Sequence, residues 1–283
     1  MSQFLLSHEP VVRLAVFGGV LAVMALWEAV RPIRTRTHAR RLRWWTNLGL
    51  SFTGSIAVRL LFPVAAVGVA VWAARENFGL LNRIDAPFAI SFLVSMVVLD
   101  LVVYAQHVAF HRFGFLWRLH RVHHADPEID ATTGIRFHPV EIMISMVVKM
   151  VAVAALGAPA AAVVAFEIVL NATAMFNHAN ITLGTAIDPL VRLAIVTPDM
   201  HRVHHSIFPD EYNTNFGFNL SLWDRLFGTY RAFPRDEQRL MRIGLEGFPG
   251  EAPIRLFWCL ALPFSAAVRT PSTSGATRPE KLR

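Results

Sequence analysis

Five long runs of apolar residues occupy the first two thirds of the chain. They extend from Val11 to Val30, Leu48 to Ala74, Phe88 to Tyr104, Val140 to Leu156 and Ala160 to Phe176. A helix needs about 20 mostly apolar residues to cross a bilayer, so these runs predict membrane-embedded helices. Arg59 and Pro63 interrupt the second run, and Gly157-Ala158-Pro159 indicates a tight turn between the last two. The pattern predicts an all-α membrane bundle with about four to five embedded helices.

Arginines between the first and second runs orient this bundle. They are Arg31, Arg34, Arg36, Arg40, Arg41 and Arg43. Loops rich in Lys and Arg stay on the cytoplasmic side, so we expect this loop to be cytoplasmic. If the second run crosses once, the third run returns to that side, and the hairpin of the fourth and fifth runs begins and ends there. A hairpin within the second run would reverse the orientation of everything after it.

Composition supports a membrane protein. Of 283 residues, 54% are hydrophobic and only 17% are charged, which is low for a soluble domain. The net charge of +7 fits cytoplasmic loops better than nucleic-acid binding. Cys259 is the one cysteine, which excludes an internal disulfide and cysteine-based metal sites. The polar stretch from Arg269 to Arg283 is predicted to be a disordered tail.

Ten of the twelve histidines form an ordered series between residues 107 and 205. Two clusters have the form H-x-x-H-H, and a third is H-x-x-x-H. Residues three or four apart share one helix face, so each cluster presents two or three imidazoles together, and the neighbours at i+3 and i+4 could reach different ions. Imidazole is a strong ligand for transition metals. The candidate ligands are His107, His111, His120, His123, His124, His138, His178, His201, His204 and His205.

An all-nitrogen ligand set suits iron, zinc, copper or nickel. Soluble di-iron bundles use Glu-x-x-His pairs, which we do not find here, and haem would need opposed axial ligands rather than clusters. Neutral ligands leave the ions strongly electrophilic, which favours oxygen activation. Two other functions stay open at this point: a zinc-dependent hydrolase of membrane lipids, and a metal transporter or sensor.

Ordered motifs from Val97 to Tyr230 connect the histidines. The pair His107/His111 is followed by a triplet at 120, 123 and 124, then by R-x-H-P-x-E from Arg136 and N-H-x-N from Asn177. A second triplet at 201, 204 and 205 precedes N-F-G-x-N-L-x-x-W-D-x-x-F-G-T-Y, which begins at Asn215. In order and spacing this resembles the sterol desaturase/fatty acid hydroxylase superfamily of membrane di-iron enzymes.

The resemblance implies a non-haem di-iron monooxygenase or desaturase with a cytoplasmic histidine-rich helical cap above the bundle. Its cofactors would be two iron ions, with O2 as co-substrate. It would oxidise a C–H bond of a lipid, such as a sterol, a fatty acyl chain or an ether lipid. Electrons would come from a ferredoxin, a cytochrome b5 or a reductase. The pair, both triplets and His178 would be the nine ligands, and His138 would be a tenth ligand or a neighbouring group.

Polar residues near the histidines are expected to support the site. Asp100 and Asp199 are predicted to accept an imidazole N–H and so orient the ring. Asp224 would do the same, or would cap a helix or form an ion pair. Asn177 and Asn180 would hydrogen-bond a metal-bound water, or form a turn. The interleaved arginines would meet solvent, lipid phosphates or a reductase; these are Arg112, Arg118, Arg121 and Arg202.

We expect three parts: membrane helices and the arginine-rich loop in 1–96, a catalytic domain in 97–235, and a carboxy-terminal segment with its tail in 236–283. The expected location is a bacterial inner membrane, with the metal site on the cytoplasmic side and no nucleic-acid partner. Hydroxylation and desaturation begin with the same abstraction, so the spacing of the ligands leaves the reaction and the lipid open.

Overall fold

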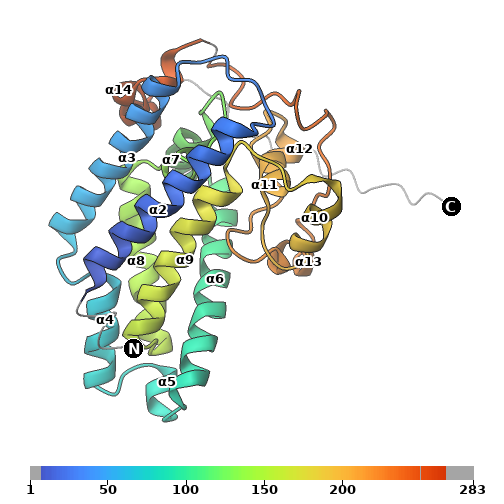
Figure 1. Cartoon of the computed structure of the whole chain (residues 1–283). Coiled ribbons are helices and arrows are strands. Elements are labelled where there is room, and N and C mark those ends of the chain that lie inside the picture. Colours follow the sequence, from blue (N-terminus) through green and yellow to red (C-terminus); the bar gives the residue numbers. More distant parts are fainter. Residues whose placement is uncertain (1–7, 249, 266–283) are drawn as a thin grey trace.

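The computed structural model describes residues 8–248 and 250–265, and the predicted tail from Arg269 lies outside this part. The long helices pack side by side in one bundle (Figure 1). They are α2 (Glu9–Val30), α3 (Arg40–Leu61), α4 (Ala65–Arg75), α6 (Phe88–Arg112), α8 (Pro139–Leu156) and α9 (Ala160–Asn177). Five segments, counting α3 to α5 (Leu80–Arg83) as one, are long and apolar enough to cross a membrane. The prediction of an all-α membrane bundle is confirmed.

The second apolar run is divided between α3 and α4, which continue in one direction along α8. Gly54 of α3 faces Ile142 near the start of α8, whereas Gly79, just after α4, approaches Gly157 at its end. Pro63 lies in the break, where its ring cannot continue a helix. The run therefore traverses the bundle once, as the orientation argument requires.

Small residues let the helices at the lower end of Figure 1 approach closely. Ala66 and Ala70 of α4 pack with Leu99 of α6 and Val153 of α8. A Cβ at Gly79 would lie 2.3 Å from the backbone nitrogen of Gly157. Only glycine permits that approach, so this contact closes the end of the bundle where α5 lies.

Short helices gather at and beside the other end and form a cap (Figure 1). They include α7 (Gly114–His124), α10 (Gly184–Val191), α11 (Pro198–His204), α12 (Pro209–Tyr212), α13 (Leu222–Leu226) and α14 (Leu256–Ala261), with the 3-10 turn η1 (Thr133–Ile135). Gly134 of η1 lies against α9, where a Cβ would come within 2.3 Å of the Ala174 carbonyl oxygen. We call this end of the bundle, where α6 and α9 finish and α8 begins, the histidine end.

Arg43, one of the arginines expected in the loop between the first two apolar runs, lies instead near the start of α3. Its side chain is fully buried at the start of α3. Its guanidinium binds both carboxylate oxygens of Asp126, at 2.8 and 2.9 Å, and Asp130 at 2.5 Å. Asp126 follows the first histidine triplet by two residues, so the Arg43–Asp126–Asp130 cluster fixes the chain leaving α7.

Candidate metal centre

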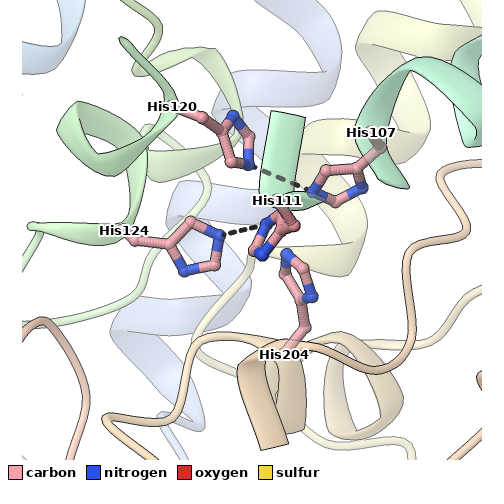
Figure 2. A group of neighbouring side chains, drawn as sticks. All are labelled: His107, His111, His120, His124 and His204. Carbon is pink, nitrogen blue, oxygen red and sulfur yellow. Dashed lines mark hydrogen bonds between the residues drawn. The ribbon is translucent and has the colours of Figure 1, made fainter. Parts of the chain in front are cut away.

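Nine histidines form two groups at the histidine end. The first group is His107, His111, His120, His124 and His204, and the second is His123, His178, His201 and His205. Every member of both groups is buried. Figure 2 shows the first group, whose rings converge from α6, α7 and α11 on one point.

Each H-x-x-H-H triplet contributes to both groups. In α7, His120 and His124 belong to the first group and His123 to the second. In and just after α11 the assignment is reversed, with His204 in the first group and His201 and His205 in the second. Residues four apart point the same way on a helix, and the intervening neighbour points elsewhere. The spacing thus distributes the imidazoles over two centres.

The ligand atoms are close enough to share one ion in each group. Within each group they all lie within 4.8 Å of one another. Two imidazoles on opposite sides of a metal ion are separated by about 4.2 Å, because each nitrogen–metal bond is about 2.1 Å. The Nε2 atoms of His107 and His120 are 3.1 Å apart, and those of His178 and His201 are 3.0 Å apart. Small movements would complete a coordination sphere.

Backbone carbonyls hold several of these rings by their other nitrogen. The Nδ1 atoms of His107, His178 and His204 each lie 2.7 Å from a carbonyl oxygen, of Phe216, Ala174 and Thr214 respectively. A carbonyl only accepts, so Nδ1 carries the proton and the lone pair of Nε2 faces the centre. This is the tautomer that a metal ligand needs.

Burial keeps the imidazoles neutral. It lowers the pKa of His120 to about 3 and that of His178 to about 4. Burial and neighbouring imidazoles hold the pKa of His201 and His205 well below the usual value. Within the described part of the chain, Nε2 of His204 and both ring nitrogens of His205 are buried without a hydrogen-bond partner. Unpaired buried lone pairs are costly, and a bound metal would satisfy them.

Glu141 is a site residue that the sequence reasoning missed. Its Oε1 lies 2.6 Å from Nδ1 of His120, in the carboxylate–histidine arrangement common around metals. The signal was present, since Glu141 closes the R-x-H-P-x-E motif and lies in the first turn of α8. Only the tertiary contact between α7 and α8 shows which histidine it serves.

His138 lies apart from both groups, although its sequence neighbours approach them. Its Nδ1 accepts a hydrogen bond from the Val140 amide at 3.2 Å, which caps the start of α8. Its Nε2 faces the Leu260 carbonyl oxygen at 3.2 Å. Both ring nitrogens are therefore engaged away from the two centres, and the structure does not bring His138 to them.

Asp100 does not contact an imidazole, contrary to the expected role. Seven residues of helix separate it from His107, about 10 Å along the axis, which is too far for one carboxylate to reach. Its Oδ2 instead accepts from the Trp223 indole at 2.8 Å and from the Leu220 amide at 3.2 Å. Asp100 thereby holds the motif that begins at Asn215 against α6.

Asp224 holds the part of the same motif that contacts a histidine. Its two oxygens accept from the backbone amides of Phe216 and Gly217, at 2.7 and 2.8 Å. The Phe216 carbonyl is the group that pairs with Nδ1 of His107. Asp224 therefore acts on a ring through the backbone. Of its three expected roles, the direct imidazole contact and the ion pair are both absent from the residues that the structure describes.

Three other expected site residues hold the chain around the histidines. Asp199 binds Arg202 and Thr182, each at 2.6 Å, and no imidazole. The Asn180 side chain pairs with the backbone of Arg34, so it faces away from the two groups. Asn177 donates to the Phe218 carbonyl at 2.9 Å, while its Oδ1 is buried with no partner in the described residues. Of the three, only Asn177 has a buried side-chain oxygen without a hydrogen-bond partner among the described residues.

The arginines that alternate with the histidines differ in their surroundings. Arg121 and Arg202 are buried, contrary to the expectation of contact with solvent or lipid. Arg121 donates to the Leu262 carbonyl and Arg202 to the Ile181 carbonyl, so both hold backbone in place. Arg112 is exposed, and Arg118 is exposed but donates to the Pro263 carbonyl.

A cavity of about 430 Å³ leads from the first group into the bundle. His107 and His120 line it, together with Phe137 and Phe218, and no member of the second group does. Phe137 stacks on His123 with ring centroids 4.6 Å apart. The two phenylalanines therefore border the cavity toward the second group. A molecule in the cavity would meet the first centre.

Comparison with known proteins gives a consistent result. Residues 92–229 match the fatty acid hydroxylase family. The chain is 26% identical to the ornithine lipid hydroxylase OlsE of Rhizobium tropici over 258 residues, 88% of this chain and 75% of that protein. It is 27% identical to human alkylglycerol monooxygenase over 58% of this chain and 35% of that enzyme. It is 26% identical to an Oryza sativa very-long-chain aldehyde decarbonylase, GL1-1, over 86% of this chain and 40% of that protein. No solved structure is significantly similar.

Proposed function

Because the chain belongs, through residues 92–229, to the fatty acid hydroxylase family, we propose that it is a membrane-bound di-iron oxygenase acting on a lipid. It uses O2 and two electrons from an external donor to hydroxylate or desaturate an unactivated C–H bond. The observation that carries the proposal is the pair of buried all-histidine groups at one end of a membrane bundle. When bound, the iron pair supplies the redox chemistry with O2.

The residues of this chain prepare that chemistry in three ways. Neutral imidazoles with their lone pairs directed inward would hold the two ions. Glu141 accepts a hydrogen bond from Nδ1 of His120 and fixes the plane of that ring. The cavity beside His107 and His120 receives the lipid and excludes water from it.

Relatives suggest which lipid to test first. The bacterial relative is named for an ornithine lipid and the animal relative for an alkylglycerol, and only the former aligns over most of its own length. A polar lipid is therefore the first substrate class to screen. The donor is a ferredoxin, a cytochrome b5 or a reductase. We place the protein in a bacterial inner membrane with the histidine end toward the cytoplasm, where such donors reside.

Metal content tests the proposed centre. Protein purified in detergent from iron-supplemented cells is expected to carry about two irons per chain by elemental analysis. His204→Ala removes a ligand of the first group and is expected to lose at least one iron. His38→Ala, outside both groups, is expected to keep both. Full iron content in His204→Ala would contradict the ligand assignment.

Oxygen dependence separates the oxygenase from the two other functions. Turnover of a lipid by iron-loaded protein is expected only with both O2 and a reductant. Equal turnover in anaerobic buffer without reductant would identify a hydrolase instead. Metal uptake into sealed vesicles, with no lipid product, would identify a transporter.

A further inference from the structure

The far part of the cavity has a charged wall, whose residues range from the buried Glu167 to the exposed Arg59. Arg13 of α2, Arg59 of α3 and Lys149 of α8 line it, with Glu167 of α9 between them. Glu167 binds Lys149 at 2.6 Å and Arg13 at 2.5 Å. Charged side chains are expensive within a membrane bundle and usually mark a pathway or a ligand. A cavity for a purely hydrocarbon molecule would not need them.

Positive charge is in excess at this wall. Arg13 also binds Glu9 at 2.7 Å, so two carboxylates face three cations. Arg59 has no hydrogen bond or ion pair with any residue that the structure describes, although it lines the cavity. Glu141, a further carboxylate of the lining, contacts His120 at the metal end and not these cations. One cation is left for an outside anion.

The charged wall lies at a definite distance along α8 from the histidine end. Glu141 and Lys149 lie on the same helix, eight residues apart, which is about 12 Å along the axis. Arg13, Ser51, Ser55 and Asn171 line both this cavity and a neighbouring groove between α2, α3 and α9. The groove gives a molecule in the bilayer a lateral way past the cations toward His107 and His120.

We propose that Arg59 and Lys149 bind a carboxylate or phosphate of the lipid, so that the cavity selects an anionic lipid and sets which carbon meets the first histidine group. The assignment of the cavity to a substrate rests on the proposed function. Lys149 lies about 12 Å along α8 from Glu141, the carboxylate that contacts His120. We expect the anionic group and the oxidised carbon to be separated by a distance on this order.

Arg59 gives the cleanest test, because it supports no ion pair whose loss would unfold the bundle. The metal-loaded full chain in zwitterionic detergent is titrated with hexadecanoate, hexadecyl phosphate and hexadecanol by calorimetry. The anions are expected to bind at least about tenfold more tightly than the alcohol, the range expected for a hydrogen bond to a charged group. The tighter of the two anions identifies carboxylate or phosphate as the natural group.

Arg59→Gln is expected to abolish most of that preference while leaving hexadecanol binding unchanged, and Arg59→Lys to restore part of it. Arg75→Gln, an exposed cation at the end of α4 outside the cavity, is the matched control and should keep it. Lys149→Met should reduce the preference, provided that its melting temperature matches the parent. Equal affinities for all three ligands, or an equal loss for all three in Arg59→Gln, would overturn the inference.

Binding and turnover distinguish this inference from the proposed function. A preference for anions without oxidation of any lipid would support anion binding at the charged wall and contradict the proposed oxygenase function. Oxidation of neutral lipids with no anion preference would uphold the oxygenase and contradict the wall.

Discussion

The carboxyl group of Glu141 connects the first turn of a membrane helix to a candidate metal ligand. Its contact with Nδ1 of His120 leaves Nε2 free to face His107. The other orienting groups described here are backbone carbonyls, which no substitution removes. Glu141 is therefore the point where a single side chain controls the direction of an imidazole.

Glu141→Ala is expected to weaken metal binding to the first group by about tenfold to a hundredfold, the usual cost of removing such a partner. Glu141→Gln retains an acceptor oxygen and should lose less. The measurement is the chelator concentration that removes half of the metal. Superimposable chelator curves for the parent and Glu141→Ala would show that His120 needs no partner.

At the scale of elements, the Arg43–Asp126–Asp130 cluster joins α3 to the loop that follows α7. The apolar runs and Pro63 could be read from the sequence, because helix length and helix breaking are local properties. The role of Arg43 could not, since its partner lies 83 residues further along the chain. For the same reason, the spacing of the histidines predicted that neighbours within a triplet point toward different ions. It did not predict that Asp100 accepts a hydrogen bond from Trp223.

Arg43→Met is expected to destabilise the protein by roughly 3–5 kcal/mol, because it leaves two buried carboxylates without their cation. Arg41→Met, on an exposed neighbour, should change stability by less than about 0.5 kcal/mol. Thermal unfolding of both metal-free variants in the same detergent makes the comparison. Similar melting temperatures would mean that the cluster contributes no net stability.

At the scale of the whole molecule, the arginine-rich loop between α2 and α3 lies at the same end of the bundle as α7 and the end of α9 (Figure 1), which carry four of the nine grouped histidines. Sequence alone predicted this because the parity of the apolar runs depends only on their number. The cavity could not be predicted, since it arises where α2 packs on α9 while α3 packs on α8.

The proposed orientation is tested with cysteines introduced at Thr35, near the histidine end, and at Glu76, near the other end. Both positions are exposed, and Cys259 is buried, so the background of labelling is low. A membrane-impermeant maleimide is expected to label Glu76→Cys in spheroplasts, and Thr35→Cys only in inverted vesicles. The reverse pattern would place the histidine end outside the cell.

The division of each histidine triplet between the two groups limits how this sequence can change in length. A helix turns by about 100° per residue. Inserting or deleting one residue between His120 and His123, or between His201 and His204, would rotate imidazoles of both groups out of position at once. The stretch from Ala179 to Thr197 separates ligands without supplying any. Natural length variation is therefore expected in such loops and not within the triplets.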